Sequence, residues 1–216
     1  MYLFNILSKT VLAFVLCVAS VNAEAPSYLV QVETHFGNTQ VDTGCGALID
    51  AEHVITCWHN LRNFTPRSKV YVVLQDGSRI EVEVLKRDQV PDLALLKLSK
   101  PTLVPSINLA NEEPRFGDTV TIESYQINIV NGNAEREYIQ RTGQVKNRFA
   151  ASQQGPDILY TVTVRTRPGN SGSPVVDKDG KLCGILFGSL ARAHVTGIEA
   201  IYQFIDGETN DSKLLR

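Results

Sequence analysis

The stretch RPGNSGSP, residues 167–174, holds a serine between two glycines. Glycine tolerates positive φ and has no Cβ, so such a turn can expose the hydroxyl of Ser171 and leave nearby backbone N–H groups free. N–H groups aimed at a developing oxyanion stabilise the transition state of acyl transfer. One such turn is weak evidence, because serine–glycine turns are common in loops. Ser171 is therefore a candidate nucleophile whose partners must come from elsewhere in the chain.

Two upstream segments supply the residue types that a serine nucleophile needs. VITCWH, residues 54–59, ends in His59 after a short apolar run, and PDLALL, residues 91–96, places Asp92 before another. A base oriented by a carboxylate activates a serine hydroxyl, and the chain order His, Asp, Ser is one in which such triads occur. Alone, His59 reads as a half-buried structural histidine and Asp92 as a strand-opening residue. Together the segments predict a triad of His59, Asp92 and Ser171.

These motifs resemble the chymotrypsin-like serine endopeptidases, in particular their compact bacterial branches. TGCGALI, residues 43–49, and the segment 54–59 resemble that family's glycine-rich strand and the strand before its histidine. DLALLKL, residues 92–98, is similar to the aspartate segment of HtrA/Deg-type proteases. GNSGSPV, residues 169–175, is similar to the nucleophile turn of bacterial glutamyl endopeptidases. The resemblance extends over residues 28–204, with the motifs in the family's order.

The chain outside its first 23 residues is dominated by short apolar or alternating runs, with little helical periodicity. Turn sequences such as QDGS at 75–78 and DKDG at 177–180 separate neighbouring runs and indicate hairpins. The predicted strands cover residues 29–34, 46–49, 54–56, 70–74, 79–85, 93–98, 119–123, 140–145, 158–164, 173–176 and 181–187. Only residues 198–205 are predicted to form a helix. This pattern indicates an all-β antiparallel sandwich or barrel.

The resemblance chooses between these two architectures. It implies two packed six-stranded antiparallel β-barrels with a short C-terminal helix. The first lobe, residues 24–110, would carry the histidine and the aspartate, and the second, residues 111–207, the serine. A proline-containing stretch at 100–114 suits the crossing between lobes, and the polar tail 208–216 is expected to be loose. The site would then lie between the lobes.

The first 23 residues have the pattern of an export signal. Lys9 precedes an apolar run at 11–21, and VNA at 21–23 resembles a small-residue cleavage site. The run is too short to span a bilayer comfortably, so removal is favoured over anchoring. Loss of Lys9 changes the net charge of −2 to −3, which argues against nucleic acid and anionic membranes as partners. We expect an exported protein, secreted or periplasmic, that acts on polypeptides; its oligomeric state stays open.

The resemblance implies an acyl-transfer mechanism. His59 would take the proton of Ser171 as that oxygen attacks a peptide carbonyl, while Asp92 fixes the tautomer of His59. The backbone N–H groups of Gly169 and Ser171 would form the oxyanion hole. No metal or cofactor is indicated, since the sequence has no HExxH, no CxxC and no glycine-rich phosphate loop.

Substrate specificity is expected to depend on the segment before the serine. Thr166 matches a threonine that helps to bind the substrate carboxylate in glutamyl endopeptidases, but the partnering histidine of that family falls at Leu186, next to Phe187. Arg165 or Arg167 would suit an acidic residue at P1, the substrate residue before the cleaved bond. Equally, both arginines would be simply solvated. The predicted substrate-binding residues are Arg165, Thr166, Leu186 and Phe187.

Three cysteines remain once the first 23 residues are removed: Cys45, Cys57 and Cys183. The family often links its glycine-rich strand to a cysteine beside the histidine, which makes a disulfide between Cys45 and Cys57 possible. The alternative is that all three are small buried hydrophobes. Asn170 stands where trypsin-like zymogens carry an aspartate that pairs with a new N-terminus. Because an asparagine forms no such ion pair, activation by that route is not expected.

Two other function classes stay open at this point. A non-catalytic relative would bind peptides in the same cleft without cutting them, although an intact triad argues against it. A serine esterase would use the same chemistry on small or lipid esters. The sequence around Ser171 lacks the G-x-S-x-G spacing of α/β-hydrolases, and the strand pattern is not α/β.

Overall fold

The structure is a computed structural model that describes residues 24–36, 40–131, 133–149, 159–189 and 192–207. The predicted signal peptide, residues 1–23, and the predicted tail, 208–216, lie outside the described residues. Within these ranges, no helix has the length and apolar character needed to cross a membrane.

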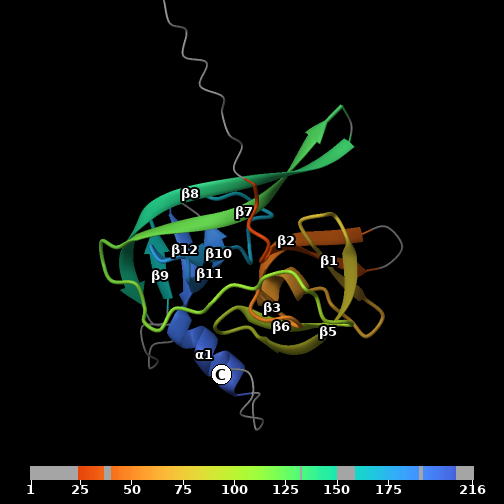
Figure 1. Cartoon of the computed structure of the whole chain (residues 1–216), viewed down its shortest axis with the longest axis horizontal. Helices are drawn as coiled ribbons and strands as arrows, with labels where there is room; N and C mark the ends of the chain where they lie inside the picture. Colours follow the sequence, from red (N-terminus) through yellow and green to blue (C-terminus); the bar gives the residue numbers. More distant parts are fainter. Residues whose placement is uncertain (1–23, 37–39, 132, 150–158, 190–191, 208–216) are drawn as a thin grey trace, which may run out of the picture.

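The first half of the chain forms a closed antiparallel barrel with the strand order β1-β2-β3-β6-β5-β4 (Figure 1). Its strands are β1 (Leu29–Phe36), β2 (Gln40–Leu48), β3 (His53–Thr56), β4 (Lys69–Val73), β5 (Arg79–Asp88) and β6 (Leu93–Leu98). Pairing of β1 with β4 closes the barrel. Buried valine, leucine and isoleucine side chains, such as Val32, Val54 and Leu96, fill its interior.

The second half forms another closed antiparallel barrel with the order β10-β11-β12-β9-β8-β7. Its strands are β7 (Thr119–Val130), β8 (Asn133–Phe149), β9 (Leu159–Val162), β10 (Pro174–Val176), β11 (Leu182–Ser189) and β12 (Ala193–Gly197). Helix α1 (Ile198–Asp206) follows β12 directly. The predicted architecture of two six-stranded barrels with a short C-terminal helix is confirmed.

The pattern-based strand assignment differs from the structure most clearly at β2, β12 and the β7–β8 ribbon. β2 begins at Gln40, six residues before the predicted strand at 46–49. β12 was not predicted, because its five residues include His194 and Thr196 and lack a clear apolar run. The β7–β8 ribbon is also much longer than the predicted strands at 119–123 and 140–145, and it runs from the second barrel across to the first (Figure 1). Its outer part carries exposed side chains such as Ile129, so no buried face imposes an alternating pattern there.

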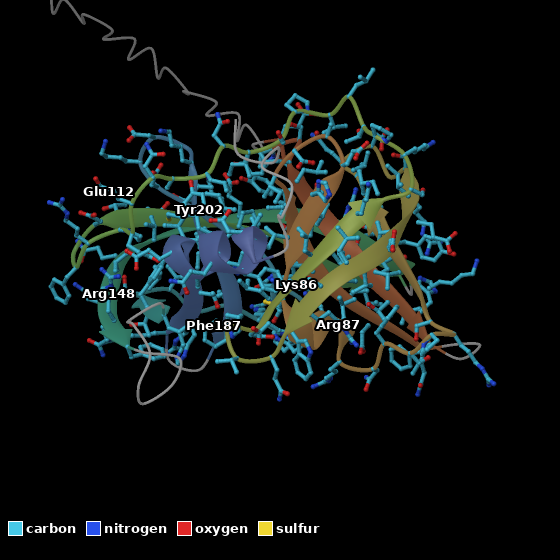
Figure 2. The ribbon with its side chains drawn as sticks, turned by 90° about the horizontal axis from the view of Figure 1, so that it is seen from below. Lys86, Arg87, Glu112, Arg148, Phe187 and Tyr202 are labelled. Atoms are coloured by element: carbon cyan, nitrogen blue, oxygen red, sulfur yellow. The ribbon has the colours of Figure 1, made fainter. Side chains whose placement is uncertain are left out.

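The two barrels share an apolar interface. The cluster that fills the second barrel also includes Cys57, Leu93 and Leu95 of the first. Helix α1 strengthens the junction, since the Lys86 ammonium of β5 donates a hydrogen bond to the Phe204 carbonyl at 2.8 Å (Figure 2). The Tyr202 hydroxyl donates to the Ala110 carbonyl, in the linker between the barrels, at 3.1 Å (Figure 2). Residues from both barrels are therefore held in a fixed relation.

Candidate active site

His59 and Asp92 are brought together by the pairing of β3 with β6. In this pair Thr56 lies opposite Ala94, so the end of β3 and the start of β6 are neighbours. His59 follows β3 in a short 3-10 helix, η1 (Trp58–Leu61), and Asp92 immediately precedes β6. The strand register thus explains why two residues 33 positions apart in the sequence meet.

The Asp92 carboxylate fixes the histidine through two contacts. Its Oδ1 accepts the backbone N–H of His59 at 2.9 Å, and its Oδ2 lies 2.6 Å from His59 Nδ1. Asp92 has a φ of 53°, in the left-handed region that non-glycine residues seldom adopt. Such backbone strain concentrates at functional sites. Both side chains keep partial solvent access, at 29% for His59 and 17% for Asp92.

Ser171 reaches the same region from the second barrel, on the turn that precedes β10. The Ser171 carbonyl accepts the Cys45 N–H at 2.7 Å and the Asn60 side-chain amide at 3.0 Å. The serine turn therefore docks beside the residue that follows His59. Within the described ranges, no side chain hydrogen-bonds the Ser171 hydroxyl, because the Asn60 contact is with the Ser171 carbonyl. The serine–histidine hydrogen bond is thus not closed here, and such bonds often tighten only when substrate binds.

The predicted oxyanion donors lie on a turn of defined conformation. Gly169 has a φ of 90°, a value that favours glycine. The N–H of Asn170 donates to the Arg167 carbonyl at 3.1 Å and that of Gly172 to the Leu186 carbonyl at 2.7 Å. Within the described part of the chain, the N–H groups of Gly169 and Ser171 have no hydrogen-bond acceptor. This arrangement leaves both groups available for an oxyanion.

The turn is braced from behind by buried polar side chains. Asn170 is fully buried, and its amide accepts the Arg167 N–H at 2.9 Å and donates to the Tyr125 carbonyl at 3.0 Å. The Ser173 hydroxyl lies 2.5 Å from that of Ser124 in β7. These contacts hold the turn to β7 without an ion pair.

The predicted substrate-binding residues divide between two cavities and the surface. Thr166 and Leu186 line a cavity of about 180 Å³ together with Ser171. Phe187 lines a separate cavity of about 290 Å³ together with His59 and Asp92. Arg165 is exposed and lines neither cavity. Arg167, the other candidate for an acidic P1, lines the cavity beside Ser171.

The cysteines are free thiols, so the disulfide between Cys45 and Cys57 is not formed. The two thiols point to different carbonyls: Cys45 Sγ lies 3.5 Å from the Gly169 oxygen, and Cys57 Sγ lies 3.0 Å from that of Leu186. Burial raises the pKa of both thiols. Cys183 is likewise buried. All three fit the alternative of small buried hydrophobes.

Two supporting residues escaped the sequence reasoning. Asn60 is buried, and its amide also donates to Thr56 Oγ1 at 3.0 Å. An asparagine directly after the histidine of an apolar segment was the available signal, since a buried amide requires partners. Tyr125 acts through its backbone carbonyl, which no sequence pattern reveals.

Comparison with known proteins agrees with the two-barrel fold. A family model described as trypsin-like peptidase domain matches residues 44–185. The Serine protease Do-like HtrA of Bacillus subtilis is 25% identical over 175 residues, covering 74% of this chain and 36% of that protein. The Periplasmic serine endoprotease DegP of Salmonella typhimurium is 28% identical over 146 residues, covering 66% and 29%. This chain thus spans less than half the length of these curated relatives.

Among solved structures, the active form of the Rv3671c protease from M. tuberculosis has the same fold, with a TM-score of 0.70 at 20% identity. The match covers 84% of this chain and 81% of that one. The resemblance to chymotrypsin-like serine proteases is therefore confirmed. The family model and the two-barrel fold agree, and the chain belongs to the trypsin-like peptidase family.

Proposed function

We propose that this protein is a serine endopeptidase that hydrolyses peptide bonds through His59, Asp92 and Ser171. The observation that carries the proposal is the double contact of Asp92 with His59, at 2.9 and 2.6 Å, next to a serine turn anchored on Asn60. Membership of the trypsin-like family supports the same chemistry. One cavity opens beside Ser171 and another beside His59 and Asp92, which gives a substrate access to both parts of the proposed triad.

In this proposal each residue has a separate role. Asp92 holds the proton on His59 Nδ1, which leaves Nε2 to accept the Ser171 proton as the hydroxyl attacks the carbonyl carbon. His59 then returns that proton to the leaving amine, and water hydrolyses the acyl-enzyme in a second cycle. The N–H groups of Gly169 and Ser171 stabilise the oxyanion by about 3–4 kcal/mol per donor.

The proposal includes export and two lobes. Residues 1–23 would direct the chain out of the cytoplasm and be removed, and one relative is named as periplasmic. The lobes would cover residues 24–110 and 111–207, with their boundary in the linker between β6 and β7. N-terminal sequencing of the protein recovered outside the cytoplasm tests export, and an N-terminus that retains residues 1–23 contradicts it.

Labelling with a fluorophosphonate tests the reactive hydroxyl without knowledge of the substrate. We expect a single adduct on Ser171, mapped by mass spectrometry, and none on the Ser171→Ala variant. Casein and a short-chain nitrophenyl ester then separate a protease from an esterase and from a non-catalytic peptide-binding relative. Casein cleavage that persists unchanged in Ser171→Ala refutes the proposed triad.

A panel of fluorogenic peptides tests the P1 residue. The cavity beside Ser171 is lined by the buried Leu186 and the exposed Arg167, so it presents both an apolar surface and a positive charge. Preference for glutamate or aspartate at P1, lost in Arg167→Ala, supports the acidic specificity. Equal or better cleavage after apolar residues rules out a preference for acidic P1 residues.

A further inference from the structure

A thiol lies beside the proposed histidine–aspartate pair. The Cys57 Sγ, a His59 ring nitrogen and an Asp92 carboxylate oxygen all lie within 4.8 Å of one another. Cys57 is fully buried, whereas the histidine and the aspartate keep partial access to solvent. We propose that these three side chains form an inhibitory site for a thiophilic divalent cation such as Zn²⁺. The inhibitory effect rests on the proposed function of His59 and Asp92.

The ligand set and its spacing suit zinc. Zn²⁺ binds cysteine sulfur at about 2.3 Å, histidine nitrogen at about 2.0–2.1 Å and carboxylate oxygen at about 2.0–2.2 Å, in a tetrahedron. Ligand atoms in such a tetrahedron are about 3–4 Å apart. Here the imidazole–carboxylate pair is closer, at 2.6 Å, and no pair exceeds 4.8 Å, so shifts of about 1 Å complete the site. Water from the cavity that His59 and Asp92 line would take the fourth position.

Charge balance also favours the ion. Burial and the neighbouring Asp92 charge raise the pKa of the Cys57 thiol. A bound dication reverses this effect, because it stabilises the thiolate and is itself neutralised by one thiolate and one carboxylate. The resulting complex buries no net charge, which limits its desolvation cost. Binding releases the thiol proton to solvent, so affinity rises with pH.

Binding of the metal would stop catalysis by reversing the tautomer of His59. Because a carboxylate accepts hydrogen bonds, the 2.6 Å contact with Asp92 Oδ2 assigns the imidazole proton of the metal-free protein to Nδ1. A metal on Nδ1 moves that proton to Nε2, the nitrogen that must accept the Ser171 proton. The base is then blocked although the ring stays neutral. A metal bound at Nε2 without Cys57 would also inhibit, and replacing Cys57 separates these two cases.

Metal titrations of the purified mature protein test the site. ZnCl₂ and CdCl₂ are titrated against peptide hydrolysis by the wild type, Cys57→Ala and Cys183→Ala, each normalised to its own metal-free rate. Cys183 is a matched control because it is also a buried free thiol. We expect the wild type and Cys183→Ala to be inhibited alike and restored by EDTA. Even outer-shell partners change metal affinity 10–100-fold, so Cys57→Ala should need at least about tenfold more metal.

Equal inhibition of Cys57→Ala and the wild type overturns the inference, as does a wild type that neither metal inhibits. The ultraviolet absorption of a Cd²⁺–thiolate bond provides a readout that needs no activity. A band present in the wild type and Cys183→Ala but absent in Cys57→Ala supports the site even if proteolysis fails. An active protein without that band refutes the site and leaves the proposed function intact. Cys57→Ser replaces Cys57→Ala if thermal unfolding shows that the latter is misfolded.

Discussion

Replacing Gly172 with alanine tests whether the serine turn depends on close contact between the barrels. Gly172 has a φ of 87°, and a Cβ there would overlap the backbone carbonyl oxygen of Cys45. The added Cβ would also lie 2.5 Å from Thr56 Oγ1 and 2.9 Å from Asn60 Nδ2. All three neighbours belong to the first barrel, and one of them is backbone that does not move aside easily.

The expected decrease in the free energy of unfolding has two contributions. The left-handed conformation costs an L-residue about 1–2 kcal/mol, and forcing an extra methyl into packed surroundings costs about 1–3 kcal/mol. Gly180 is a matched control, because its φ is 73° but no atom lies within 4 Å of its Cβ position. Gly180→Ala should therefore lose only the stability that the left-handed backbone conformation costs. The difference of about 1–3 kcal/mol corresponds to about 2–12 °C in Tm for a chain of this size.

Thermal unfolding followed by circular dichroism measures this difference, and peptide hydrolysis measures the displacement of Ser171. We expect Gly172→Ala to have the lower Tm and a much lower kcat, while Gly180→Ala keeps its kcat. Equal losses of Tm in the two variants, or a normal kcat in Gly172→Ala, would show that the turn does not depend on this contact.

Substitutions at three further residues test their proposed roles. Asp92→Asn should lower kcat by about 10⁴-fold with little change in KM, because the amide favours the wrong tautomer of His59; a kcat within about tenfold of the wild type contradicts this role. Asn170→Asp places a buried carboxylate against the Tyr125 carbonyl and should cost about 3–5 kcal/mol in urea unfolding at pH 8, whereas Asn170→Ser should cost less. Burial raises the pKa of Glu113 from 4.5 to about 7, so the folded state binds more protons between these values and stability falls as pH rises across that window. In the wild type this effect should lower the free energy of unfolding by about 2–3 kcal/mol between pH 4.5 and pH 8, and Glu113→Gln should remove that decrease. If stability depends on pH in the same way in the variant, Glu113 is not the source of the decrease.

Strand periodicity predicted the fold class but not the architecture. Alternating runs separated by hairpin turns indicate antiparallel sheet, and they do not distinguish a sandwich from a barrel. Barrel closure depends on pairs such as β1 with β4, whose partners are remote in sequence. The resemblance supplied the two barrels. β12 escaped prediction because its place is fixed by β9 and β11 on either side of it rather than by its own composition.

Motifs in the sequence nominated the residues of the candidate site. His59 ends one recognisable segment, Asp92 lies near the start of another, and Ser171 lies inside a third. Which residues before the serine line the cavity could not be predicted in this way. Residues 164–168 form no regular strand, so no fixed period indicates which side chains face the cavity. Thr166 lines the cavity beside Ser171, and Arg165 does not. The disulfide that the resemblance made possible is not formed, and the alternative of buried free thiols holds, because the Cys45 and Cys57 thiols point to different carbonyls.

β7 links the start of the described chain to the serine turn through three successive residues. The Tyr28 hydroxyl donates to the Glu123 carboxylate at 2.5 Å, Ser124 contacts Ser173, and the Tyr125 carbonyl accepts the amide of Asn170. An aspartate in place of Asn170 would repel that carbonyl and would need a cation, such as a newly formed N-terminus, to be stable. The asparagine instead donates to it. The turn therefore has its bracing partners within the folded barrels, and this neutral contact is a physical reason to expect activity without an N-terminal ion pair.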